Sequence, residues 1–101
     1  MYSWGSRDMT TATLNGVTLA RSDSTEMVEG NHYFPSDSVN WDLFAKTDRS
    51  THCPWKGDAS YYDVTADGQT AENVAWQYEA PLEKATHIKD YVAFYPAVSV
   101  A

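Results

Sequence analysis

Two dipeptides, Asn15-Gly16 and Asp67-Gly68, each separate two short segments that are rich in β-branched or aromatic residues. Both residues of such a dipeptide tolerate a positive φ, which a two-residue hairpin turn of type I′ requires. The first dipeptide predicts a hairpin with strands near residues 10–14 and 17–21. The second dipeptide joins two segments, in each of which successive side chains alternate between two faces, into another hairpin. A chain with two such hairpins is constrained toward antiparallel β-sheets.

Along each strand of the second hairpin, successive side chains point to opposite faces of the sheet, with a period of two. In the segment before Asp67, Tyr61 and Tyr62 fall on opposite faces. In the segment after Gly68, the alternation sends Val74, Trp76 and Tyr78 to a single face. We therefore expect Trp76 and Tyr78 to be neighbours on one side of a strand.

Two other segments break the period of two. Segment 36–44 has apolar residues spaced four and one apart behind serines that favour a helix start. Segment 82–88 has apolar residues three apart, directly after a proline. Both predict a short helix, and segments 24–30, 32–35 and 91–100 predict further short strands. The expected fold is mainly β, with antiparallel sheets and two short helices.

The composition narrows the class of protein. A chain of 101 residues fits a single domain, which we place over 1–101. Fourteen acidic residues against seven basic ones give a net charge of -7, and the basic residues form no run, so we expect no nucleic-acid partner. We also expect no membrane span, because no apolar run approaches roughly 18 residues.

The single cysteine cannot form an internal disulfide, and the first residues lack the basic-then-apolar pattern of a signal peptide. These two features favour a cytoplasmic location. They leave the oligomeric state open.

Four stretches occur in an order and spacing that resembles one known family, the domain-of-unknown-function 427 family, over about residues 14 to 98. The resemblance implies a β-tent, in which antiparallel sheets meet at an angle over a central pocket, as in methionine sulfoxide reductase B and the ligand-binding domain of cereblon. The stretches are "YFPSDSV" at 33–39, "THCPWKGDASYY" at 51–62, "NVAWQYEAPL" at 73–82 and "IKDYVAFYP" at 88–96.

The chain departs from two properties that the resemblance implies. Many β-tent proteins hold zinc with paired Cys-x-x-Cys motifs, whereas this chain has one cysteine and no zinc-like spacing of its histidines, so we expect no metal site. The family also has a nucleotidyltransferase label. The stretch "PWKG" is neither a P-loop nor a dinucleotide fingerprint, and the sequence identifies no cofactor.

Cys53 is the sharpest candidate for chemistry, because a thiolate is a good nucleophile when a nearby base or cation lowers its pKa. On an extended strand His52 and Cys53 point to opposite faces, so His52 is poorly placed to serve as that base. Lys56 follows the Pro54-Trp55 turn and is the second catalytic candidate, because it can fold back and supply positive charge. The alternative is a buried structural cysteine.

The aromatic residues near this stretch predict a pocket for a small molecule of unknown identity, although the same rings are also what a small β domain uses to fill its core. In that pocket aromatic side chains stack on the ligand, Lys56 contacts an anion, and Thr51 and Asp37 donate or accept hydrogen bonds. The complete set of predicted ligand-binding residues is Tyr33, Asp37, Thr51, Cys53, Lys56, Tyr61, Trp76 and Tyr78.

Two other functions remain open at this point. The first is an enzyme that uses Cys53 as a nucleophile or redox thiol. The second is a protein-interaction module, which a surface-exposed Trp4 or Trp41 would favour. Whether the chain catalyses any reaction is undecided by the sequence.

Overall fold

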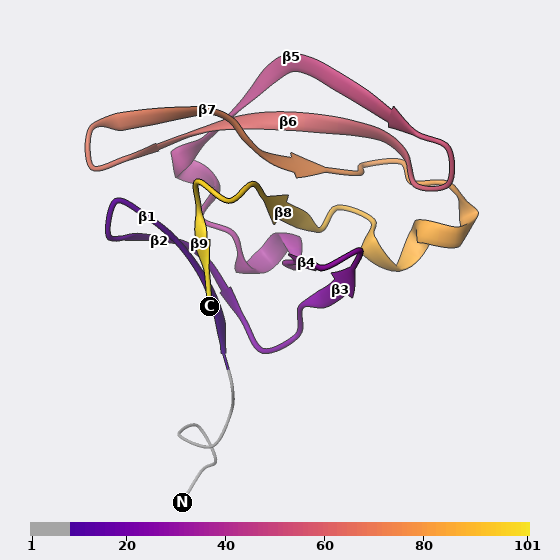
Figure 1. The fold of residues 1–101 in the computed structure, drawn as a ribbon, viewed down its shortest axis with the longest axis horizontal. Helices are drawn as coiled ribbons and strands as arrows, with labels where there is room; N and C mark the ends of the chain where they lie inside the picture. Colours follow the sequence, from indigo (N-terminus) through magenta and orange to yellow (C-terminus); the bar gives the residue numbers. More distant parts are fainter. Residues whose placement is uncertain (1–8) are drawn as a thin grey trace, which may run out of the picture.

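The structure is a computed structural model that describes residues 9–101. Its largest sheet is antiparallel with the strand order β5-β6-β7-β8 (Figure 1). The strands are β5 (Phe44–Cys53), β6 (Gly57–Ala66), β7 (Gln69–Gln77) and β8 (Val92–Phe94). A second hairpin, β3 (Glu26–Val28) and β4 (Asn31–Tyr33), is joined to β8 through the bridge between Phe34 and Val92.

A smaller antiparallel sheet has the order β2-β1-β9, and its strands run across those of the larger sheet (Figure 1). These strands are β1 (Thr10–Leu14), β2 (Val17–Ser22) and β9 (Ser99–Val100). Short 3-10 turns form two other connections: η2 (Ser36–Ser38) and η3 (Trp41–Leu43) lie between β4 and β5, and η4 (Glu83–Ile88) connects β7 to β8. The predicted mainly β fold of antiparallel sheets is confirmed.

Both predicted hairpins are present, and their turn residues have the expected backbone. Asn15 and Gly16 have φ of 51° and 78°, and Asp67 and Gly68 have φ of 54° and 75°. The predicted helices are also in place, but they are 3-10 turns rather than α-helices. The first is split into η2 and η3, because the backbone returns to extended geometry at Val39 (φ -99°, ψ 135°).

Strands β6, β7 and β8 bury side chains on both faces of the large sheet, whereas β5 is largely exposed, and pairing across the strands shows which side chains share a face. Tyr62 pairs with Ala75, which pairs with Phe94, and this row lies in one hydrophobic cluster. This cluster is called the first face below. It also holds Phe34 and side chains of the smaller sheet such as Ala12, Leu19 and Ala20.

The next row, in which Tyr61 pairs with Trp76 and Trp76 with Ala93, lies in the other cluster, called the second face. Tyr61 and Tyr62 therefore point to opposite faces, as predicted. The second face contains buried Val28, Tyr33, Ala59, Tyr61, Tyr78, Ala85, Ile88 and Ala93, with half-buried Cys53, Trp55, Trp76 and Tyr91 against them.

Val74 does not share a face with Trp76 and Tyr78 as the alternation predicts. It packs in the first face, whereas the other two side chains pack in the second. Asn73 has a φ of 50°, and the register of β6 and β7 shifts at this point. Its N–H donates to the Asp63 carboxylate at 2.7 Å. This bulge rotates the strand, so the simple period of two ends at Val74.

The described residues contain no helix that is long and apolar enough to cross a membrane.

Candidate functional site

Lys56 lies in the turn between β5 and β6, and a close backbone approach holds this turn in place. The Leu82 N–H donates to the Lys56 carbonyl oxygen at 2.9 Å. Gly57 has a φ of 108°, and a Cβ there would lie 3.3 Å from the Leu82 nitrogen. Only glycine fits this conformation and this space without strain. The segment that follows β7 therefore packs on the turn and helps to bury Lys56.

The Lys56 side chain is buried among aromatic rings on the second face. The residue is only 7% exposed, and its Nζ lies 5.4 Å from the centre of the Trp55 ring and 5.7 Å from that of the Tyr78 ring. The ammonium donates to a carboxylate oxygen of Glu29 in a salt bridge. Glu29 is at the tip of the β3–β4 hairpin with a φ of 53°, and its side chain is 52% exposed. A buried cation is thus paired with a half-exposed anion.

This pairing affects the protonation of the groups around it. Burial is the largest single effect on Lys56 and opposes its charge, but the hydrogen bond to Glu29 and the nearby Tyr33 and Tyr78 together raise its pKa above the usual value. The hydrogen bond from Lys56 lowers the pKa of Glu29. Burial raises the pKa of Tyr78 to about 12. At neutral pH the site therefore holds an ammonium, a carboxylate and neutral phenols.

Tyr33 connects Lys56 to Trp76. The Trp76 Nε1–H donates to the Tyr33 hydroxyl at 3.0 Å, and the two rings meet edge to face with centres 6.1 Å apart. Tyr33 is fully buried, burial raises its pKa, and its hydroxyl is close enough to Lys56 for the ammonium to influence that pKa. Trp76 remains half-buried, with its indole N–H already engaged. The exposed part of Trp76 therefore presents ring carbon rather than a donor.

A second polar group lies on the same face, beyond Trp76. The Thr51 and Tyr61 hydroxyls are 2.8 Å apart, and the Tyr61 and Tyr95 hydroxyls are 3.4 Å apart. Tyr95 packs against Trp76 with ring centres 4.7 Å apart, and the Arg49 guanidinium lies 4.9 Å from the centre of the Tyr61 ring. The face thus runs from Arg49 through four aromatic rings to Lys56, with hydroxyl groups along it.

Cys53 also lies on this face, half-buried against the aromatic cluster. His52 lies on the other face, as predicted from the extended strand, and its Nδ1 is 2.7 Å from the Asp58 carboxylate. The structure therefore separates Cys53 from the nearest base in sequence. Among residues 9–101 no group of three or more His, Cys, Asp or Glu side chains is arranged to hold a metal ion.

The structure brings seven of the predicted residues to one face and leaves Asp37 apart. Asp37 is exposed in η2, next to Val39 of the first face. Trp41 is half-buried against the first face, with its Nε1–H donating to the Ser36 carbonyl, and Trp4 lies outside the described residues. The seven residues on the second face are Tyr33, Thr51, Cys53, Lys56, Tyr61, Trp76 and Tyr78.

Three functional candidates were missed by the sequence interpretation: Glu29, Arg49 and Tyr95. Glu29 is 27 residues from Lys56, and only the β3–β4 hairpin brings it there. Tyr95 is part of the quoted stretch "IKDYVAFYP", which was a signal for it. A pocket of about 260 Å³ also opens beside Tyr95, between β4 and β9, and none of the eight predicted residues lines it.

Comparison of the sequence with known proteins identifies the family of the chain. No curated protein matches it. One family model matches residues 5–101, which is nearly the whole chain, and its description is "Domain of unknown function (DUF427)". The match covers every residue of the second face described above and agrees with the resemblance of the four stretches. The chain therefore belongs to the DUF427 family.

Proposed function

We propose that the domain binds a small planar molecule that carries an anionic group, with its ring against Trp76 and its anion at Lys56. The observation that carries this proposal is the lysine buried among aromatic rings, whose carboxylate partner Glu29 is half-exposed on a hairpin turn. Because its pKa is raised, Lys56 stays protonated and serves as an anion contact rather than as a nucleophile.

The energetics of Lys56 support this role. A buried ammonium is unfavourable unless an anion accepts its hydrogen bonds, and a core that only had to be filled would be at least as stable with an apolar side chain of similar volume. Glu29 supplies the anion from a position where its side chain can rotate into water. A ligand carboxylate can therefore replace Glu29 without leaving a second charge buried.

Shape is the second argument. Trp76 is half-buried with its donor engaged by Tyr33, and Tyr33 lies close to Lys56. We infer that a flat ring on the exposed part of Trp76 brings an anionic group at its edge to Lys56 when that group replaces Glu29. Offset stacking on an indole contributes about 0.5–1.5 kcal/mol beyond the area buried. The proposed ligand class is aromatic carboxylates of one ring.

A thermal-shift series tests the proposal with benzoate and 4-hydroxybenzoate, using benzyl alcohol and 4-hydroxybenzyl alcohol as uncharged analogues. A ligand at a hundred times its dissociation constant adds about 2.7 kcal/mol, and in a domain of this size each kcal/mol raises the midpoint by roughly 4–8 °C. We expect the carboxylates to raise the midpoint more than their neutral analogues.

Two variants assign the effect to the site. Lys56→Met is expected to abolish the preference for carboxylates, since it keeps the side-chain volume and removes the charge. Lys46→Met is the matched control, because Lys46 forms an exposed salt bridge with Glu79 away from Trp76. A carboxylate preference that survives in Lys56→Met, or that disappears in Lys46→Met, contradicts the proposal.

A further inference from the structure

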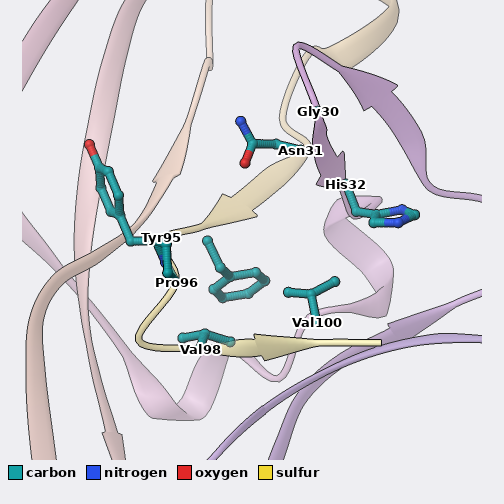
Figure 2. Close-up of a pocket in the computed structure, with 8 residues that line it drawn as sticks. Gly30, Asn31, His32, Tyr95, Pro96, Val98 and Val100 are labelled. Atoms are coloured by element: carbon teal, nitrogen blue, oxygen red, sulfur yellow. The ribbon is translucent and has the colours of Figure 1, made fainter.

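A pocket lies between β4, the end of β8 and β9 (Figure 2), and it shares Tyr95 with the face that carries Lys56. Its volume is about 260 Å³. Gly30 and Asn31 form one side, Tyr95 and Pro96 the opposite side, and Val98 and Val100 close the third. Phe94 also lines it, and the Phe94 side chain belongs to the first face.

The pocket exists because the chain leaves the large sheet at this point. Pro96 follows β8, has no N–H for a continued ladder, and begins the turn in which the Val98 N–H donates to the Tyr95 carbonyl at 2.9 Å. After the turn β9 pairs with β1 in the smaller sheet. On the other side, Gly30 has no Cβ, and a Cβ there would meet nothing within 4 Å. The two sheets diverge, and no side chain of residues 9–101 fills the space between them.

One amide distinguishes this pocket from an apolar packing defect. The Asn31 side chain extends from β4 toward the Tyr95 and Pro96 side, whereas the His32 ring points away (Figure 2). The His32 Nδ1 is already 2.9 Å from the Thr25 hydroxyl. Within residues 9–101, the Asn31 amide makes no hydrogen bond with another side chain or backbone group. It therefore offers one donor group and one acceptor to a molecule in the pocket.

Size and charge define the occupant. Water occupies about 30 Å³ per molecule in the liquid, so the pocket holds roughly nine waters or one single-ring molecule. An asparagine amide matches a carboxamide, which also has both a donor and an acceptor, better than it matches a carboxylate. The net charge of -7 also disfavours an anion where no cation lines the walls.

The geometry points to a second binding site, in which a neutral single-ring carboxamide packs against Phe94, Val98 and Val100 and pairs with the Asn31 amide. This site does not depend on the proposed function, because its residues and its ligand class differ from those at Lys56. The two sites approach each other at Tyr95, which lines the pocket and contacts Trp76.

A titration of the ¹⁵N-labelled protein with benzamide tests the inference. The chain has five glycines, so their amide signals are readily assigned, and Gly30 lines the pocket whereas Gly57 follows Lys56. We expect benzamide to shift the Gly30 signal with a dissociation constant on the order of 1 mM. Gly57 is expected to change little. Benzoate, which tests the other site, should shift Gly57 and the Trp76 indole, and any Gly30 change that comes from the adjacent Glu29 should disappear in Lys56→Met.

Variants complete the test. Asn31→Ala is expected to weaken benzamide binding about tenfold, because two hydrogen bonds are lost. Asn40→Ala is the matched control, since Asn40 is an exposed asparagine outside the pocket. Val100→Trp fills the pocket and is expected to abolish the Gly30 shift while the spectrum stays dispersed.

Three results would overturn the inference. They are no Gly30 shift at tens of millimolar benzamide, a shift confined to Gly57 and the Trp76 indole, and unchanged affinity in Asn31→Ala. Each of these can occur while benzoate still binds at Lys56, so failure here is distinguishable from failure of the proposed function.

Discussion

Both faces of the large sheet carry a cluster of buried side chains, but the two clusters differ in chemical composition. Around Val64, Val92 and Phe94 the first face is mostly hydrocarbon, and its main polar contact is a buried hydrogen bond from the Tyr62 hydroxyl to the Gln77 amide oxygen at 2.6 Å. The second face contains an ammonium at Lys56 and an indole donor at Trp76, together with the hydroxyls of several tyrosines. Lys56, Trp76 and the hydroxyls of Tyr33 and Tyr61 each have a partner, and none of the fully buried side-chain polar atoms in the described residues lacks a hydrogen bond.

The difference supports our proposal that one face serves stability and the other serves ligand binding. Apolar packing holds sheets together without directional partners, and it is the less demanding solution for a face that only fills space. A face that keeps a buried cation and several hydroxyls in fixed positions needs a matched partner for each of them. We therefore propose that the first face serves the fold and that the second serves ligand binding.

The largest expected effect is on the first face. Phe34→Ala is expected to lower the free energy of unfolding by about 3–5 kcal/mol, because the ring is fully buried and contacts Phe94. Phe34→Leu keeps most of the volume and should cost about 1 kcal/mol. Guanidinium unfolding measures both. If Phe34→Ala lowered the free energy of unfolding less than Tyr33→Phe does, the proposed division of roles between the two faces would be contradicted.

Breaking the ion pair is expected to have the next largest effect. Glu29→Gln leaves the Lys56 ammonium without a counter-charge and should lower stability by about 2 kcal/mol. Lys56→Met removes the buried charge instead and is expected to be nearly neutral. Urea unfolding of both variants measures the difference. Equal losses in the two proteins would show that Lys56 contributes to the fold rather than to a binding site.

A smaller effect is expected from the hydroxyl that joins Tyr33 to Trp76. Tyr33→Phe removes the acceptor of the Trp76 Nε1–H and should lower stability by about 1 kcal/mol, since the half-buried indole can still donate to water. The Trp76 indole signal should also move in the NMR spectrum. An unmoved indole signal would mean that this hydrogen bond does not order the second face.

The smallest expected effect is the pH dependence of stability. Because the folded-state pKa of Glu29 is lowered from 4.5, this group stabilises the fold above that value, and the contribution is lost as the pH falls through the folded pKa. Its side chain is half-exposed and its folded pKa is lowered, so only part of the contribution is lost between pH 6 and pH 3, under about 1 kcal/mol. Urea unfolding at pH 3 to 6 should show a smaller slope in Glu29→Gln than in the natural chain, and identical slopes would contradict the pairing.

Local signals account for the parts of the fold that the sequence predicts well. The Asn15-Gly16 and Asp67-Gly68 turns act through the backbone preferences of two residues, and no distant contact is needed to recognise them. Alternation predicts that Trp76 lies beside Tyr78, but it fails at Val74. The bulge at Asn73 is accompanied by a hydrogen bond from its N–H to the Asp63 carboxylate. The alternation of side chains along one strand gives no information about such a contact with the neighbouring strand.

The candidate site was also predictable where local sequence patterns determine it, and not where contacts between distant segments do. Lys56 and the aromatic residues lie within recognisable stretches, so their proximity on one face followed from strand geometry. Glu29 reaches Lys56 only through the β3–β4 hairpin, and Asp37 turns away from the site because η2 packs beside Val39 instead. Contacts between distant segments decide both positions, and a single sequence does not encode them in any local pattern.

The central claim is that Lys56 and Trp76 bind an anionic ring, and one titration tests it most directly. The ¹⁵N-labelled protein and its Lys56→Met variant are titrated with 4-hydroxybenzoate while the Trp76 indole and Gly57 amide signals are followed. We predict saturable shifts of both signals in the natural chain and at least a tenfold weaker response in Lys56→Met. Unmoved signals in the natural chain, or equal shifts in both proteins, would contradict the claim.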